Sequence, residues 1–417
     1  MTLEPRKTCR ICNHDQLTTI MSLGKLHLAA YTPKDNEPEA VLDKFPLELV
    51  RCTAPDCGLV QLRHSAPSDL LYEHYFYKSG INKTMTENLK GVVAQATSKV
   101  ELNENDIVLD IGCNDGTLLK NYQGKKLRLV GFDPAKNMAK FSKETGAHII
   151  VDYFTAKSFL EHYNDDKAKI ITSIAIFYDL EDPNQFVSNI AKILDENGIW
   201  VIELKYLPTM ILKNAFDDIV HEHLEYYHFS VIEYVLKKYG LKVIDASLND
   251  SNGGSIRVFV KHVNQPIDEE SKKHLSELRR SEETMNLNTD RPYEEFFQRC
   301  EKLKELAVSF IKKESSVGKK IHAYGASTKG NTILQYYGLD NTIIETIADR
   351  NPDKWSRKTI GTNLKIISEE ESRSLNPDYY LILPWHFLDE FRQREKEFFK
   401  NGGKFIVPLP DFKIIDG

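Results

Sequence analysis

Two stretches of the chain share one pattern: a short apolar run, a glycine-rich turn, and then a run that favours a helix. The first reads IVLDIGCNDGTLLKNY from Ile107, and the second reads IHAYGASTKGNTILQYYG from Ile321. After each turn, further apolar runs alternate with helical stretches, which is typical of parallel sheets covered by helices. The chain has 417 residues, too many for one ordinary core. The sequence therefore predicts an α/β protein with two Rossmann-like, doubly wound domains.

The first glycine-rich turn favours a ligand without phosphate. Its glycines, Gly112 and Gly116, do not follow the G-x-G-x-x-G spacing that places a pyrophosphate at a helix N-terminus. Asp115 would repel phosphate, whereas S-adenosylmethionine (SAM) carries a positive sulfonium. Asp133 ends the next apolar run, where it can accept hydrogen bonds from ribose hydroxyls, and Asp152 is expected near the adenine. An NAD site is the alternative. The predicted cofactor-binding residues here are Asp110, Gly112, Asn114, Asp115, Gly116, Asp133, Pro134 and Asp152.

The second glycine-rich turn has a different chemistry. It carries Ser327, Thr328 and Lys329 and no acid. Backbone N–H groups at a helix start, together with a lysine, suit a phosphate or a diphosphate. The alternative is a ligand-free duplicate that only supports the first domain.

Four of the six cysteines lie near the N-terminus, as two close pairs, Cys9 with Cys12 and Cys52 with Cys57. Each pair can supply two corners of a tetrahedron, and four thiolates suit Zn²⁺. A closed shell of four sulfurs leaves no position for substrate, so the sequence predicts a structural zinc site. The metal would help a short, turn-rich segment to fold.

The overall composition narrows the class of partner and the compartment. The net charge is −6, which argues against a broad nucleic-acid-binding face. The sequence has neither a long apolar run for a membrane span nor the apolar core of a signal peptide at its N-terminus. We therefore expect a cytoplasmic protein without nucleic-acid or membrane partners. The predicted domains are 1–70 (zinc binding), 71–265 (SAM binding), 266–316 (a charged helical linker) and 317–417 (the second Rossmann-like unit).

The stretch DIVHEHLEYYHFS, from Asp218, concentrates polar rings and acids just after an apolar run that ends the first sheet. Its histidines His221 and His223 are two residues apart, which does not match the H-E-x-x-H spacing of a helical zinc site. A structural or exposed role for these histidines is the plain alternative. However, ligands bind beyond the carboxyl ends of such strands. His223, next to Glu222, is therefore a candidate general base near neutral pH.

The whole chain resembles the sugar C-methyltransferase family. The cysteine pairs and the motifs DIGCNDG, AIFYDLEDP, HEHLEYY, NGGSIRVF and YGASTKGN stand in the same order as in those bacterial enzymes, which methylate carbon 3 of a nucleotide-linked 4-keto-6-deoxysugar. The resemblance implies a zinc-bearing N-terminal lobe, a SAM domain, and a C-terminal Rossmann-like domain that helps to hold the sugar nucleotide. It also implies that His223 is the base and that Glu222, Tyr77, His221 and Tyr226 belong to the catalytic site.

The same resemblance extends the predicted ligand sites. We add Phe177 and Tyr178 to the cofactor site. The predicted substrate-binding residues are Lys205, Asn252, Ser255, Arg257, Tyr324, Ser327, Lys329, Asn331, Arg350 and Lys354. The expected activity is SAM-dependent C3-methylation by a monomeric enzyme. Two alternatives remain open at this point: an NAD(P)-dependent oxidoreductase acting on a nucleotide sugar, and a non-catalytic zinc-knuckle interaction protein.

Overall fold

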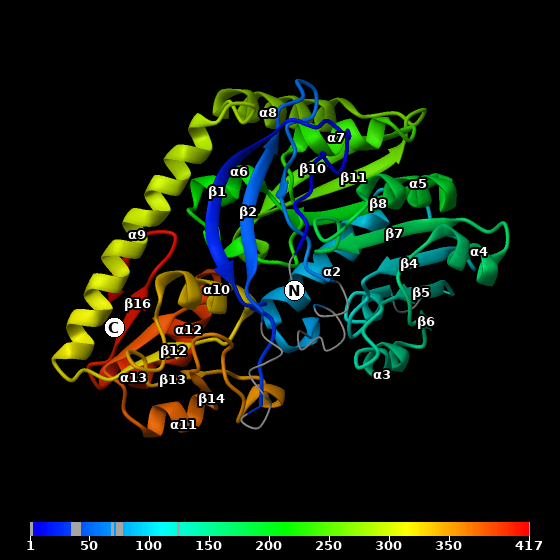
Figure 1. The fold of residues 1–417 in the computed structure, drawn as a ribbon. Helices are drawn as coiled ribbons and strands as arrows, with labels where there is room; N and C mark the ends of the chain where they lie inside the picture. The colour runs from blue at the N-terminus through cyan, green and yellow to red at the C-terminus, as the bar shows by residue number, and fades with distance from the viewer. Residues whose placement is uncertain (1–2, 35–42, 68–70, 72–77, 123–125, 417) are drawn as a thin grey trace.

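The computed structural model describes residues 3–34, 43–67, 71, 78–122 and 126–416. Three sheets organise the described chain (Figure 1), and they contain four, seven and six strands. The two larger sheets are the Rossmann-like units expected from the sequence, and the smallest belongs to the N-terminal lobe. Tyr77, a predicted catalytic residue, lies outside the described residues.

The N-terminal sheet is antiparallel and borrows a strand from the middle of the chain. Its order is β1-β2-β3-β9. Val60 pairs with Tyr226 and Gln61 pairs with Glu225, so part of the HEHLEYY motif becomes the edge strand of the N-terminal lobe. The four strands are β1 (Leu17–Leu26), β2 (Phe45–Cys52), β3 (Val60–Leu62) and β9 (Glu225–Tyr226).

The second sheet has the order β10-β11-β8-β7-β4-β5-β6. Strands β4 to β8 are parallel, as the alternating pattern predicted. The sequence did not reveal the antiparallel strand β11, which pairs with both β8 and β10 and makes the sheet mixed. The strands are β4 (Ile107–Ile111), β5 (Arg128–Phe132), β6 (His148–Ile150), β7 (Ala168–Ile174), β8 (Leu194–Lys205), β10 (Leu241–Asn249) and β11 (Ser255–His262).

In the described part of the chain, six helices belong to this unit, and α2, α4 and α5 begin at side-chain caps. The Asp182 side chain accepts from Gln185 N at the start of α5, and Thr155 accepts from Ser158 N at the start of α4. The helices are α2 (Lys83–Ser98), α3 (Ala139–Ser142), α4 (Ala156–Tyr163), α5 (Pro183–Ile193), α6 (Leu207–Leu212) and α7 (Phe229–Lys237).

The third sheet has the order β14-β13-β12-β15-β16-β17. It is parallel except for β17, which closes the edge as an antiparallel strand. The strands are β12 (Ile321–Tyr324), β13 (Thr346–Ala348), β14 (Lys365–Ile367), β15 (Tyr379–Ile382), β16 (Lys404–Val407) and β17 (Lys413–Ile415). The helices are α10 (Thr328–Tyr337), α11 (Glu369–Ser374), α12 (Leu388–Arg394) and α13 (Lys396–Lys400).

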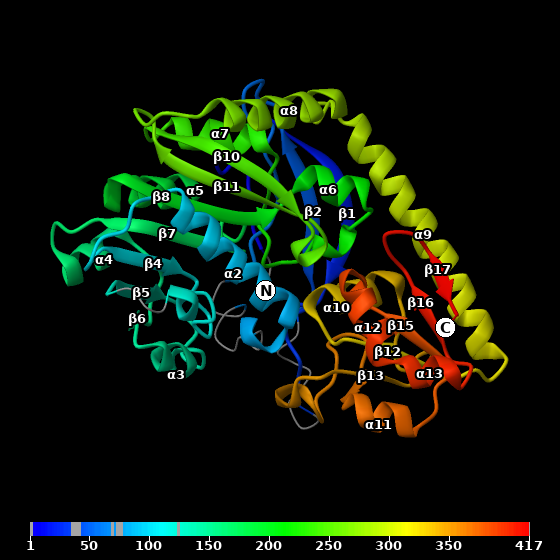
Figure 2. The same ribbon diagram turned by 180° about the vertical axis from the view of Figure 1, so that it is seen from behind.

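Two long helices, α8 (Glu269–Met285) and α9 (Arg291–Ser316), connect the two Rossmann-like units. Figures 1 and 2 show α9 running down one side of the molecule towards the third sheet. Its buried residues, among them Phe296, Cys300 and Ala307, recur at helical spacing and join a hydrophobic cluster shared by the N-terminal sheet and the C-terminal unit. The N-terminal sheet, α9 and the C-terminal unit therefore share one continuous hydrophobic core.

The four N-terminal cysteines meet in space although 39 residues separate the two pairs in the sequence. Their Sγ atoms all lie within 4.8 Å of one another, and the Cys9–Cys57 and Cys12–Cys52 distances are 3.6 and 3.5 Å. Four thiolates at this separation fit the tetrahedral shell of zinc. The zinc site is structural because the sulfurs fill all four positions.

Among the helices of the described residues, none combines the length and the apolar character that a membrane span requires.

Replacing Cys52 with serine tests the zinc site. We expect the wild-type chain to carry about one zinc per molecule and the variant to lose it, with a lower thermal midpoint. Cys300→Ser is the matched control, since Cys300 is a buried cysteine in α9, outside the cluster. Metal analysis and thermal denaturation provide the measurements. Full zinc retention by Cys52→Ser would contradict the assignment.

Candidate functional site

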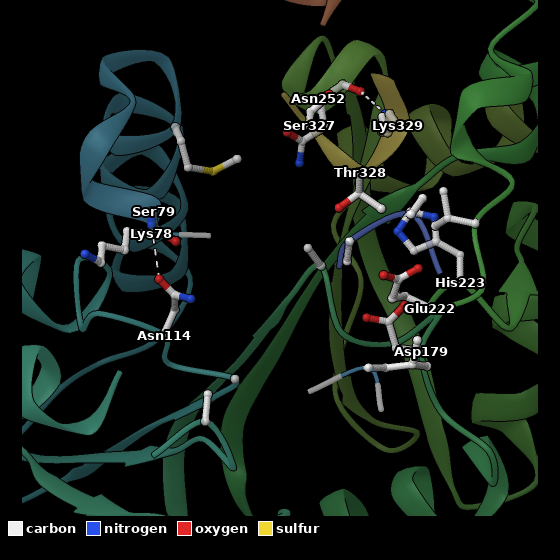
Figure 3. A pocket seen from close by; sticks show the side chains of 18 of the residues that line it. Lys78, Ser79, Asn114, Asp179, Glu222, His223, Asn252, Ser327, Thr328 and Lys329 are labelled. Atoms are coloured by element: carbon white, nitrogen blue, oxygen red, sulfur yellow. Dashed lines mark hydrogen bonds between the residues drawn. The ribbon is translucent and has the colours of Figure 1, made fainter. Parts of the chain in front are cut away.

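One cavity of about 1050 Å³ opens between the two Rossmann-like units. The carboxyl ends of parallel strands reach it from both sides: Asp110 in β4 from the SAM-type unit, and Tyr324 in β12 from the C-terminal unit. The motif containing Glu222 and His223 forms part of the wall between them (Figure 3). Such strand ends are where ligands bind in α/β sheets.

Backbone hydrogen bonds fix the first glycine-rich turn. The Asp133 carboxylate accepts from Asn114 N at 2.8 Å and from Ala135 N at 2.8 Å. Gly112 has a φ of +72°, and a Cβ there would lie 2.3 Å from Ile176 Cδ1, so only glycine fits. The turn therefore holds the Asp133 carboxylate at the cavity wall, where its remaining lone pairs can accept from hydroxyl groups.

Seven of the predicted cofactor-binding residues line the cavity. Asp110 is buried, which raises its pKa to about 7, and it accepts a hydrogen bond from Thr172 Oγ1 at 2.6 Å. Carboxylates beside apolar surface, such as that of Phe132, suit a ligand with a ribose, an adenine and a cationic centre. The seven residues are Asp110, Gly112, Asn114, Asp133, Pro134, Asp152 and Tyr178.

The structure does not bring the other three predicted cofactor residues to the cavity wall. Asp115 accepts from Gly80 N at 2.8 Å and from the Thr117 hydroxyl at 2.6 Å, so its carboxylate anchors the neighbouring segment. Gly116 permits close packing, because a Cβ there would lie 2.5 Å from a methyl carbon of Thr145. Phe177 is fully buried among core rings.

His223 lines the cavity with one ring nitrogen already assigned. Its Nδ1 lies 2.8 Å from the main-chain carbonyl oxygen of Asp218. A carbonyl can only accept, so Nδ1 carries the proton and the lone pair of the neutral ring is on Nε2. Burial lowers the pKa of His223 to about 4 against the opposing effect of the Asp218 charge, which keeps the ring neutral at pH 7. The Tyr178 ring meets it edge-on at 4.4 Å between centroids.

Two acids next to the imidazole have buried carboxylate oxygens without a hydrogen-bond partner among the described residues. Both carboxylate oxygens of buried Glu222 and one of Asp179 have no hydrogen-bond partner among the described residues. Both acids line the cavity, and Figure 3 shows Glu222 below His223 with Asp179 below Glu222. Burial raises the pKa of Glu222 to about 7. Burial, followed by the charge of Glu222, raises the pKa of Asp179.

The structure directs His221 and Tyr226 away from the cavity. His221 is buried against the N-terminal sheet, where its Nε2 lies 3.1 Å from the Phe45 carbonyl oxygen. The Tyr226 hydroxyl donates to the Asp218 carbonyl at 3.4 Å. Their contacts hold the loop that carries His223. The sequence predicted that both residues belong to the catalytic site, but neither lines the cavity.

Most of the predicted substrate residues line the cavity, and six of them come from the C-terminal unit. Ser327 caps α10 by accepting from Gly330 N, and the Asn331 side-chain N–H donates to Ala29 O. Arg350 reaches Ile81 O at 2.7 Å, and Lys354 donates to Ala326 O at 2.7 Å. The predicted residues that reach the wall are Lys205, Asn252, Tyr324, Ser327, Lys329, Asn331, Arg350 and Lys354.

Arg257 and Ser255 are exceptions, and local contacts explain them. The buried Arg257 guanidinium binds Glu203 at 2.6 Å, Gln95 at 2.8 Å and Asn88 at 2.8 Å. The Ser255 hydroxyl donates to Ser251 O. Neither side chain lines the cavity, because neighbours in its own unit already satisfy it.

Sequence reasoning missed three residues that the structure brings to this site. Asp218 carries the carbonyl that orients His223. It is the first residue of DIVHEHLEYYHFS, but nothing in the sequence indicated a role for it in the site. Asp179 lies in AIFYDLEDP and lines the cavity; an acid just after a strand was the sequence feature that could have marked it. Lys78 joins Asp353 at 2.8 Å and so connects the cavity edge of one unit to the other; nothing in its spacing marked it.

Comparisons with known proteins find similar sequences and similar folds. Three family models match: a zinc binding domain (residues 9–72), a methyltransferase domain (residues 83–246) and a C-methyltransferase C-terminal domain (residues 250–410). Among solved structures, a methyltransferase in complex with the Trm112 activator from Haloferax volcanii has 17% identity over 44% of this chain and 94% of that chain, with a TM-score of 0.35. The N-methyltransferase NodS from Bradyrhizobium japonicum has 16% identity over 43% and 97%, with a TM-score of 0.33.

A full-length relative is more informative than any single domain. The C-methyltransferase NovU from Streptomyces niveus is 30% identical over 414 residues, which covers 99% of this chain and 98% of the relative. The match therefore spans all three sheets, the cysteine cluster and the cavity between the units. This chain belongs to the C-methyltransferase family that includes NovU, and SAM and zinc are its cofactors.

Proposed function

We propose that the chain transfers a methyl group from SAM to carbon 3 of a nucleotide-linked 4-keto-6-deoxysugar, with His223 as the general base. The observation that carries this proposal is the orientation of the imidazole. Its Nδ1 proton is bound by the Asp218 carbonyl, which leaves the Nε2 lone pair available in a cavity shared by both nucleotide-type units. A neutral, half-buried ring of this kind suits proton abstraction next to a ketone.

The reaction begins with removal of a weakly acidic proton. The 4-ketone acidifies the proton on carbon 3, His223 Nε2 accepts it, and the electron pair moves to the ketone oxygen to give an enolate. Donors at that oxygen lower the barrier by about 3 kcal/mol each. Burial raises the pKa values of Glu222 and Asp179, so in their protonated forms these acids can supply such donors, as can the predicted Tyr77.

The methyl donor and the sugar nucleotide approach from opposite units. When bound, SAM would supply an electrophilic methyl group. The enolate carbon would attack this methyl as its bond to sulfur breaks, and S-adenosylhomocysteine would be the leaving group. The residues around Asp133 would hold its ribose, and those around Ser327, Arg350 and Lys354 would hold the nucleotide and its diphosphate. Holding both reactants in one closed space contributes much of the rate enhancement. The zinc cluster takes no part in these steps.

The two alternative functions explain fewer features. An oxidoreductase would not need a neutral imidazole beside two acids whose carboxylate oxygens are in part without partners among the described residues. The methyltransferase family match also opposes it. A non-catalytic knuckle protein would not need the shared cavity. The monomeric state and the cytoplasmic location stay predictions from the sequence.

Replacing His223 with asparagine tests the proposal. Asparagine keeps a polar group but has no basic nitrogen, so we expect methyl transfer to fall about 1,000-fold, within the range typical of a lost general base. Mass spectrometry of a panel of 4-keto-6-deoxy nucleotide sugars would detect the gain of one methyl group. Calorimetric titration of SAM provides the control, with an affinity close to that of the wild type. Undiminished turnover by His223→Asn would rule out this base.

The pKa of Glu222 predicts a pH-dependent stability. Folding raises this pKa from 4.5 to about 7. The folded state therefore favours the protonated acid, and this contribution is full below the unfolded pKa and is lost as the pH rises through about 7. Because Glu222→Gln cannot ionise, we expect it to match the wild type near pH 5 and to be more stable by about 2 kcal/mol near pH 8.

Thermal denaturation of both proteins across this pH range provides the measurement. Glu144→Gln, which removes an exposed acid, should show no such divergence. Parallel stability curves for wild type and Glu222→Gln would contradict a buried, protonated Glu222.

A further inference from the structure

Asp218 connects the proposed base to two buried lysines. Its main-chain carbonyl accepts the Nδ1 proton of His223 at 2.8 Å. Its side chain forms ion pairs with Lys205, at 3.0 Å, and with Lys329. The residue is almost completely buried. One amino acid therefore fixes the tautomer of the imidazole through its backbone while its carboxylate is held from two directions.

The two lysines come from different units of the chain. Lys205 ends β8 of the SAM-type sheet, whereas Lys329 lies in the first turn of α10 in the C-terminal unit. Both ammonium groups also donate to the main-chain carbonyl of Asn252, with a Lys329 Nζ to Asn252 O distance of 3.1 Å. Asn252 has a φ of +51° in the turn before β11. The cluster thus joins elements that are far apart in sequence.

This arrangement changes the interpretation of Lys329. The second glycine-rich turn predicted that its charge binds a phosphate, but its ammonium already has a carboxylate and a carbonyl as partners. A buried carboxylate without a cation is costly, typically by several kcal/mol. Removing Lys329 would leave Lys205 as the one cation paired with Asp218 among the described residues. The carboxylate would lose part of its charge compensation, so we expect its side chain to shift or to become hydrated, and the backbone that holds His223 to move with it.

We infer that Asp218 is a positioning residue for His223, and that Lys329 makes the orientation of the base depend on the docking of the C-terminal unit. The inference deepens the proposed function and rests on it for the role of His223. Neighbouring contacts support it: the Trp385 indole, also from the C-terminal unit, donates to the adjacent Asp217 at 3.1 Å. The packing of the C-terminal unit and the orientation of the base therefore depend on the same contacts.

The charges around His223 give the inference an electrostatic signature. Besides burial, Asp218 raises the pKa of His223, and Lys329 and Lys205 lower it. Tyr178, Asp179 and Glu222 also face the ring; burial raises the pKa of Asp179, and it raises the pKa of Glu222 to about 7, which favours the protonated form of each acid. Loss of the Lys329 charge should therefore raise the pKa of His223, and loss of the Asp218 charge should lower it.

Nitrogen-15 NMR of the histidine side chains tests this without substrate. The His223 signal is assigned by its absence from His223→Asn. In the wild type we expect a neutral Nδ1–H tautomer between about pH 5 and pH 8. In Lys329→Met we expect a mixed tautomer and a pKa higher by about 1 unit or more, whereas Asp218→Asn should shift it downward. Opposite shifts are not produced by general loosening of the fold.

Matched variants separate the specific effect from instability. Lys329→Arg keeps the cation and should retain the wild-type spectrum. Lys213→Met removes a nearby lysine from an exposed ion pair with Asp250 and should also leave it unchanged. If Lys329→Met fails to fold, Lys205→Met removes the other cation and is expected to raise the same pKa. An Nε2–H tautomer in the wild type, or an unchanged His223 signal in Lys329→Met, would overturn the inference.

Kinetics distinguish this inference from the proposed function. With the sugar nucleotide and SAM, Lys329→Met should lower kcat about 100-fold, the scale of a misplaced catalytic group, while KM for SAM stays constant. Lys329→Arg should restore most of the rate. An inactive wild type with the expected spectrum would count against the proposed function alone. An active wild type with an unaffected Lys329→Met would count against the positioning role alone.

Discussion

The hydrogen bond from His223 Nδ1 to the carbonyl of Asp218 is the interaction on which the chemistry of this molecule depends. It commits the proton to the side of the ring that faces the protein and leaves a basic nitrogen for the cavity. Burial suppresses the imidazolium form, so the ring is a neutral acceptor at physiological pH. The partner of Nδ1 is a neutral carbonyl and not a carboxylate. The basicity of His223 is therefore raised less than it would be by a buried acid bound at Nδ1.

The loop that carries this histidine is fixed from several sides. On one side, β9 is an edge strand of the N-terminal sheet, and the fully buried Arg10 approaches Glu225 at 3.4 Å. On another, the ion pairs of Asp218 reach into the C-terminal unit. The zinc cluster therefore contributes to the site indirectly, because it stabilises the lobe whose sheet holds the loop. Rigid support on all sides is what a base needs when its geometry decides the rate.

Much of this organisation was predictable from the sequence. Glycine-rich turns after apolar runs located both nucleotide-type units, the cysteine pairs located the zinc site, and the carboxylates at 110 and 133 did reach the cavity. Residue type and spacing are sufficient there because local geometry dictates the outcome. The sequence could not show which polar side chains are already satisfied. Arg257 had the right chemistry for a substrate ligand, but Glu203 and two amides use its donors.

Two other features could not be predicted from the sequence, because both depend on contacts that form only in the folded chain. The carbonyl of Asp218 is part of the backbone, so no residue pattern reports its direction, and the pairing of β3 with β9 joins segments that lie far apart in sequence.

Proton abstraction by His223 is the step on which the proposed reaction depends, and isotope exchange tests it most directly. Incubation in heavy water with the accepted ketosugar nucleotide and S-adenosylhomocysteine, which has no methyl to transfer, should place deuterium at carbon 3, and His223→Asn should place none. Undiminished exchange by His223→Asn, or deuterium at carbon 5 instead, would contradict the account.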